Sequence, residues 1–170
     1  MDNNYLDLDN KYLVTVFEKH LYPLVYKGFQ SHTILPETYN QPLKLIYEGS
    51  FYLEVVRDFP CNTYINLSPR NLTGLRENKM VLGQLIYTLS EHKEYIGDFF
   101  QEIGCYYQNY EENVGKICDC FFAYFDEIQK SLRPENYPVI KTKLKVDEIL
   151  YLKRTGFYPQ DYGSPKDDLS

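Results

Sequence analysis

Apolar residues in the first part of the chain recur at the spacing of an amphipathic helix. From residue 10 to residue 27 they fall on one side of a helix with 3.6 residues per turn, and they are Leu13, Val16, Phe17, Leu21, Leu24 and Val25. Pro23 has no backbone N–H to donate, so we expect the regular part of this helix to end near Tyr22. Gly28 suits the position after a helix end, and Phe29 can pack back onto the last turn.

After a loop over residues 30–42, the apolar spacing changes to the two-residue period of a β-strand. Three apolar or alternating runs predict strands, at residues 43–47, 51–57 and 63–67. Short segments rich in turn-forming residues separate each run from the next. Consecutive strands with such short connections pair antiparallel, so this part of the chain predicts a small antiparallel meander.

Helical spacing returns in the second half, after a loop over residues 68–78. Residues 79–103 place their apolar side chains within an arc of about 100°. The phase of this arc continues through the polar stretch SEHKE, which predicts one long helix. Residues 114–130 carry a second apolar stripe and predict another amphipathic helix.

The C-terminal part of the chain has two competing assignments. In residues 139–146, VIKTKLKV, apolar residues alternate with lysines, which favours an edge strand that resists aggregation. A helix is the alternative assignment. Asp147 is expected to cap a short last helix, and residues 159–170 are expected to form a flexible tail. We therefore expect one α+β domain over residues 1–158, with a small antiparallel sheet packed against three to four amphipathic helices.

Length and charge narrow the classes of function. A chain of 170 residues can bury one sizeable core without disulfides. Its formal net charge of −6 opposes binding to nucleic acids and to anionic membranes. The polar N-terminus does not resemble a signal peptide, and no apolar run reaches the roughly 20 residues that span a bilayer. We expect a cytoplasmic protein with reduced cysteines.

The sequence contains no recognisable catalytic or metal-binding motif. Cys118 and Cys120 are two positions apart, so on a helix they point to different sides and cannot bind one ion together. Cys118 belongs to the apolar stripe and is expected to be buried. Phosphate-binding loops, nucleophile elbows and paired histidine motifs do not occur. We therefore expect no cofactor, no metal and no catalytic residue, although Cys61 or Cys105 with a distant histidine leaves a spatially assembled site open.

An acidic stripe on the predicted long helix is the strongest candidate for a binding surface. Its carboxylates, which lie within about 80° of one another around the helix axis, are Glu91, Glu94, Asp98 and Glu102. Like charges at this spacing repel each other, so a positively charged partner, or a basic patch of the chain itself, would relieve them. The alternative is a solvated face screened by salt. Further residues with the character of a protein interface extend the surface, namely Tyr106, Tyr107, Tyr110, Glu111 and Glu112.

The order of elements resembles that of small immunity proteins of bacterial polymorphic-toxin systems. The segments that carry this resemblance are LVYKGF at residues 24–29, LKLIYEGSFYLEVVRD at 43–58 and TYINL at 63–67, followed by acidic helices. The resemblance implies a stoichiometric inhibitor of a secreted toxin, and a phage-borne inhibitor of a host defence protein is a related reading.

Three hypotheses for the function follow. The first is a non-enzymatic inhibitor that binds a basic partner protein, either a toxin or a defence protein, through the acidic, tyrosine-rich surface. The second is a small enzyme whose site is assembled from distant residues. The third is a structural subunit that forms a homo-oligomer through its aromatic surface.

Overall fold

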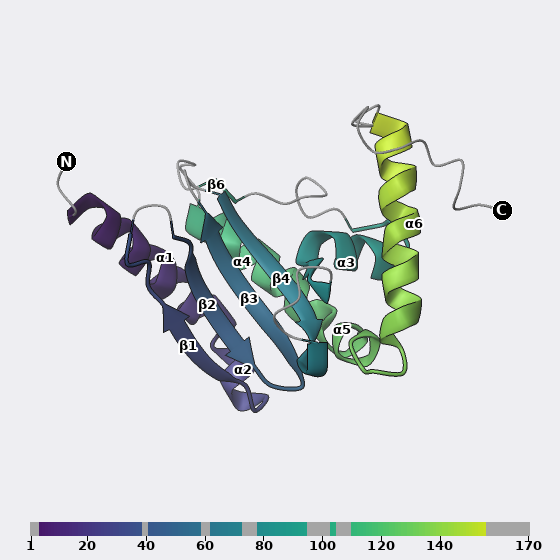
Figure 1. Ribbon diagram of the computed structural model, residues 1–170, viewed down its shortest axis with the longest axis horizontal. Helices are drawn as coiled ribbons and strands as arrows, with labels where there is room; N and C mark the ends of the chain where they lie inside the picture. Colours follow the sequence, from purple (N-terminus) through teal and green to yellow (C-terminus); the bar gives the residue numbers. More distant parts are fainter. Residues whose placement is uncertain are drawn as a thin grey trace.

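The protein is an α+β structure in which helices cover one face of an antiparallel sheet (Figure 1), as the sequence predicts. The computed structural model describes residues 4–38, 41–58, 62–72, 78–94, 103–104 and 110–155. The helices are α1 (Asn4–Leu21), α2 (Pro23–Tyr26), α3 (Leu82–Leu89), α4 (Tyr110–Ala123), α5 (Phe125–Ser131) and α6 (Tyr137–Thr155), with a 3₁₀ turn η1 (Arg70–Leu72). The strands are β1 (Gln30–Ile34), β2 (Leu43–Glu48), β3 (Phe51–Asp58), β4 (Asn62–Pro69), β5 (Met80–Val81) and β6 (Ile103–Gly104).

The sheet has the order β1-β2-β3-β4-β5, and β6 pairs with β4 beside β5. All the pairings are antiparallel. The predicted meander is confirmed by β2, β3 and β4, whose register places Leu53 between Tyr47 and Leu67. Figure 1 shows α1, α2 and α4 behind the sheet, with α3, α5 and α6 beyond its β4 side.

The first helical segment ends as the sequence predicts. α1 stops at Leu21, and α2 restarts at Pro23, where the missing N–H of proline is tolerated in the first turn. After α2, Gly28 adopts a φ of +83° and donates its N–H to the carbonyl of Val25 at 3.1 Å. The N–H of Phe29 reaches back to the carbonyl of Leu24 at 3.0 Å. These two bonds form a Schellman motif, which turns the chain from the helix into β1.

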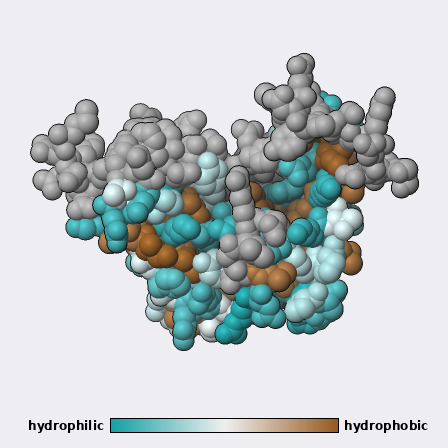
Figure 2. All heavy atoms as spheres, viewed as in Figure 1, coloured by the Kyte–Doolittle hydropathy of each residue, from teal (hydrophilic) through white to brown (hydrophobic). Residues whose placement is uncertain are grey.

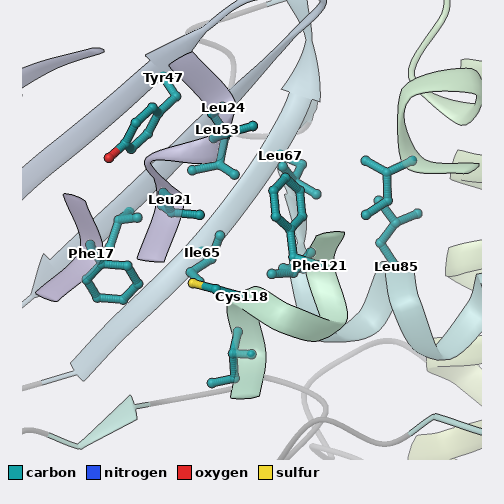
Figure 3. Packing of buried hydrophobic residues seen from close by; sticks show 14 of the residues in the cluster. Phe17, Leu21, Leu24, Tyr47, Leu53, Ile65, Leu67, Leu85, Cys118 and Phe121 are labelled. Carbon is teal, nitrogen blue, oxygen red and sulfur yellow. The ribbon is translucent and has the colours of Figure 1, made fainter. Parts of the chain in front are cut away.

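The core lies between the inner face of the sheet and the helices behind it (Figure 3). Phe17 and Leu21 of α1 and Phe121 of α4 point towards strand residues such as Leu53 and are 0–1% exposed. Each fully buried side chain of this size contributes roughly 1.5–3 kcal/mol of burial free energy. Around Phe121 the rings of Phe29, Phe51 and Phe125 meet mostly edge to face or tilted. This aromatic cluster joins the first helical segment, the sheet and the α4–α5 pair.

Three segments differ from the sequence predictions. Residues 30–42, expected as a loop, contain β1. Among the described residues of the expected long helix over 79–103, Met80 and Val81 form β5 and the helix α3 runs from Leu82 to Leu89. The helix expected over 114–130 is divided at Tyr124 into α4 and α5.

The alternative assignment of residues 139–146 is the correct one, because they lie within α6. Ile140 and Leu144 are four residues apart and, with Tyr137, form a buried face. Asp147 is therefore not a helix cap: it lies in the middle of α6 and is 6% exposed. Among the described helices, none has both the length and the apolar character needed to cross a bilayer. The expected tail over 159–170 lies outside the described residues.

Candidate protein-binding surface

The end of α3 determines where the predicted acidic residues lie. Glu91 has a φ of +53° and donates its N–H to the carbonyl of Thr88 at 3.3 Å. His92 has a φ of +69° and donates its N–H to the carbonyl of Tyr87 at 2.8 Å. This is the same Schellman pattern as at Gly28, but here non-glycine residues occupy the left-handed conformation, which costs each of them about 1–2 kcal/mol.

Side-chain contacts hold this strained turn in place. The hydroxyl of Ser90 donates to the carbonyl of Tyr87 at 3.1 Å and accepts the N–H of Glu94 at 2.9 Å. The ring of His92 stacks on the ring of Tyr87, with centroids 4.5 Å apart. Nε2 of His92 lies 3.0 Å from Oδ1 of Asp147 in α6. These contacts explain why the helix stops although the apolar periodicity continues through SEHKE.

The helical acidic stripe is therefore wrong as a geometric prediction. Glu91 and Glu94 are both exposed, but they lie in and after a turn rather than on successive turns of one helix. Oε2 of Glu91 is 3.9 Å from Nζ of Lys93, a contact between two highly exposed side chains. Asp98 and Glu102 lie outside the described residues, as do Tyr106 and Tyr107.

The remaining predicted residues, at the start of α4, do not form an open acidic surface. Tyr110 is buried at 7% exposure, and its ring packs against Tyr12 of α1. Glu111 accepts a hydrogen bond from Lys19 of α1 at 2.6 Å, which lowers the pKa of Glu111. Glu112 pairs with Lys116 at 2.7 Å one turn along α4, and its pKa is lowered by that contact. The chain's own lysines thus already neutralise these two carboxylates.

The fold instead brings Glu94 to the junction of α4 and α5. Tyr124, the residue between these helices, is half-buried, and its pKa is raised by burial and then by the negative charges of Glu94 and Glu127. Cys120 is also half-buried, and its pKa is raised by burial and then by Glu94. A phenol thus lies within the electrostatic influence of two exposed carboxylates, which are 33 residues apart in the sequence.

We name Glu94, Tyr124 and Glu127 the Tyr124 surface. Sequence reasoning misses it, because both Tyr124 and Glu127 lie in the amphipathic helix predicted over residues 114–130, where the spacing places Tyr124 on the apolar side and Glu127 on the polar side. The spacing of Tyr124 and Glu127 is that of helix neighbours and could have suggested this pair. The position of Glu94 relative to Tyr124 depends on where α3 ends, and no pattern in the sequence predicts it.

Two other groups of titratable side chains are satisfied within the fold. Glu54 of β3 is 2% exposed, and it pairs with Lys79 at 2.6 Å and with Lys44 at 3.3 Å. Cys118 is buried in α4, and burial raises the pKa of its thiol to about 12. A thiol with such a pKa is a weak nucleophile near neutral pH. Both groups therefore have structural roles in this part of the molecule.

Comparison with protein-family models, with curated proteins and with solved structures gave no match for this chain. In the part of the chain that the structure describes, no three His, Cys, Asp or Glu side chains gather as a metal-binding group.

Proposed function

We propose that this protein is a non-enzymatic inhibitor of the immunity or anti-defence type, which binds a basic partner protein through the Tyr124 surface. The observation that carries the proposal is the grouping of Tyr124 with Glu94 and Glu127, whose negative charges both act on its phenol. The proposal keeps the acidic, tyrosine-containing surface expected from the sequence. It assigns that surface to the α4–α5 junction rather than to a long helix.

The charges of this surface favour a positively charged partner. Among the described residues, no lysine or arginine forms an ion pair with Glu94 or Glu127, in contrast to Glu111 and Glu112. Burial, and then the negative charges of Glu94 and Glu127, raise the pKa of Tyr124, so its phenol stays protonated and can donate a hydrogen bond. Arginine or lysine side chains of a partner would relieve the unfavourable grouping of negative charge.

Tyr124 supplies the apolar part of the contact. Tyrosine combines a large rigid ring with a hydroxyl and is enriched at the energetically important centres of protein interfaces. The net charge of −6 on the whole chain would also attract a basic protein from a distance and speed its association. Such fast, charge-assisted binding suits an inhibitor that must capture its target before the target acts.

For the test, the candidate partner is a basic protein encoded by a gene adjacent to that of this chain. We expect that protein to inhibit growth when it is expressed alone, and co-expression of this chain to restore growth. A double variant, Glu94→Lys with Glu127→Lys, should lose protection and weaken binding by at least about 100-fold, which corresponds to about 2.7 kcal/mol. Binding is measured by titration calorimetry at low and at moderate salt.

A matched control carries the same change of net charge at exposed sites elsewhere, Glu37→Lys with Glu135→Lys. This control should retain protection and bind nearly as tightly as the wild type. Equal losses in the two double variants would mean that only overall charge matters, and the Tyr124 surface would be rejected. Unchanged toxicity in the presence of the wild-type chain would reject the inhibitor proposal itself.

A further inference from the structure

β1 is an open edge of the sheet. It pairs with β2 on one side, from Gln30 opposite Glu48 to Ile34 opposite Lys44, and is the first strand of the sheet order. All five of its residues are exposed. The other end of the sheet differs, because β4 is covered there by β5 and β6. Within the described structure, the backbone N–H and C=O groups on the outer side of β1 have no strand beside them, so they can pair with a strand of another molecule.

The sequence of β1 lacks the usual devices that prevent edge pairing. Natural edge strands commonly carry lysines, prolines or inward-pointing charges that discourage a second strand from adding. β1 reads Gln-Ser-His-Thr-Ile and contains no Lys, Arg, Asp, Glu or Pro. A strand of this composition is free to accept a partner without burying a formal charge.

Exposed apolar side chains gather at both ends of β1. Before it, Tyr22, Val25 and Tyr26 are 55%, 45% and 79% exposed, and the two tyrosine rings meet edge to face at 5.3 Å. After it, Ile34 and Leu35 are 47% and 62% exposed. Figure 2 shows hydrophobic surface over the strands at the left of this face, interrupted by hydrophilic surface. Apolar groups beside an open edge are typical of an interaction site.

We propose that two copies of this chain associate by antiparallel pairing of β1 with β1 of the second copy, about a two-fold axis beside His32. In this register Ser31 lies opposite Thr33 of the second copy, and Gln30 lies opposite its Ile34. Facing serine and threonine side chains form a favourable cross-strand pair. The only identical residues that face each other are the two copies of His32.

The distribution of apolar side chains favours a second copy over an unrelated strand. Antiparallel pairing brings the end of β1 that follows Tyr26 beside the end of the second β1 that carries Ile34 and Leu35. The two-fold axis repeats this contact, so one operation covers both exposed clusters in both copies. An unrelated extended segment would use the backbone edge but would need its own matching apolar groups at both ends.

The dimer leaves the Tyr124 surface accessible. In Figure 1, β1 lies at one end of the sheet, whereas α5 and α6 lie beyond the other end. In a dimer formed through β1, the α4–α5 junction that carries the Tyr124 surface would therefore lie on the side of the sheet away from the axis in each copy. The dimer does not depend on the proposed inhibitor function, and either proposal can fail without the other.

Sedimentation equilibrium of the full chain near neutral pH tests the proposal. Small interfaces associate weakly, so the protein concentration is varied from about 5 µM to about 500 µM. We expect a monomer–dimer equilibrium in the wild type and a monomer throughout for His32→Lys, which places two like charges face to face on the axis. His32→Gln keeps the size and polarity without a charge and should dimerise like the wild type. Circular dichroism and thermal melting of each variant verify that the monomer remains folded.

Apolar substitutions locate the interface. The double variant Tyr26→Ser with Leu35→Ser should weaken dimerisation by at least about tenfold, equivalent to about 1.4 kcal/mol. Val139→Ser removes a side chain that is 70% exposed on α6 and should leave dimerisation unchanged. Amide hydrogen exchange in residues 31–33 should slow as the protein concentration rises.

Four outcomes would overturn the proposal. The first is a wild type that stays monomeric over the whole range, which would leave the edge open for a different partner. The second is a His32→Lys variant that dimerises as well as the wild type. The third is loss of the dimer in Val139→Ser, which would place the interface on α6. The fourth is growth into open-ended assemblies, because a two-fold contact closes at two copies.

Discussion

The carboxylate of Asp147, in the middle of α6, lies 3.0 Å from Nε2 of His92, in the turn that ends α3. The same carboxylate accepts a hydrogen bond of 2.8 Å from the buried hydroxyl of Thr88. One aspartate of the last helix thus contacts both the final turn of α3 and the left-handed residue that follows it. This contact fixes the direction in which the chain leaves α3, and so the position of Glu94.

Removing the carboxylate should therefore loosen α6 from α3. We expect Asp147→Ala to lower the free energy of unfolding by about 1–3 kcal/mol, because the Thr88 hydroxyl would remain buried without its acceptor. Asp147→Asn keeps an acceptor oxygen and should cost less. Urea unfolding measures both variants. A loss of less than about 0.5 kcal/mol in Asp147→Ala would show that the contact is not needed for stability.

Glu91 offers a site where a substitution should stabilise the protein. Its φ of +53° is unfavourable for a residue with a Cβ, and its contact with Lys93 at 3.9 Å joins two highly exposed side chains. We expect Glu91→Gly to raise the free energy of unfolding by about 0.5–1 kcal/mol, because the strain exceeds the unfolded-state entropy that glycine adds. Glu91→Ala retains a Cβ and serves as the control, which should show no gain in thermal or urea unfolding.

Gly49, in the turn between β2 and β3, is required for a different reason. A Cβ at this position would lie 2.5 Å from Cγ of Phe29, whose ring packs against Phe51. We expect Gly49→Ala to cost about 1–3 kcal/mol through this overlap. In a Phe29→Ala background the cost of Gly49→Ala should largely disappear, because the colliding ring is gone.

Gly28→Ala is the comparison for Gly49. Here a Cβ would have no heavy atom within 4 Å, but φ is +83°, so the substitution strains the backbone alone. Its cost of about 1–2 kcal/mol should persist when Phe29 is replaced by alanine. Equal behaviour of the two glycines in the Phe29→Ala background would contradict this distinction.

The thiol of Cys118 should make stability depend on pH in the alkaline range. Burial raises its pKa from an ordinary value near 9.0 to about 12, so the folded state holds the thiol proton more tightly than the unfolded state. The resulting stabilisation is fully present below about pH 9 and is lost as the pH rises towards about 12. The urea midpoint of the wild type should therefore fall more steeply over this window than that of Cys118→Ala.

Alkylation provides an independent measurement of the same thiol. Near pH 8.5, iodoacetamide should modify Cys118 in the folded protein at least about 100-fold more slowly than in urea, because only the thiolate reacts. Cys120 is half-buried and should react at an intermediate rate, as followed by peptide mass spectrometry. Equal rates for the two cysteines in the folded protein would show that Cys118 is not protected.

Local signals in the sequence were sufficient where neighbouring residues decide the structure. Pro23 and Gly28 marked the end of the first helical segment, because a missing N–H and a left-handed φ are properties of the residue itself. The alternation of residues 43–67 was sufficient to predict the meander, since consecutive strands joined by short turns pair with each other. The stripe that includes Cys118 and Phe121 likewise predicted a buried helical face.

Contacts between distant residues decided the rest. The apolar periodicity of residues 79–103 has no break at Leu89, and among the contacts that hold the turn there, the pairing of His92 with Asp147 joins residues far apart in the sequence. Residues 139–146 alternate like a strand, yet they are helical, and the helix buries Ile140 and Leu144 together because it brings residues four apart to one face. The sequence by itself determined the α+β class, the meander and the amphipathic faces, which depend on backbone chemistry and local spacing. Only the tertiary structure decided that the charge of Glu94 acts on Tyr124 and that β1 remains an open edge of the described sheet, since both depend on how segments far apart in the sequence pack together.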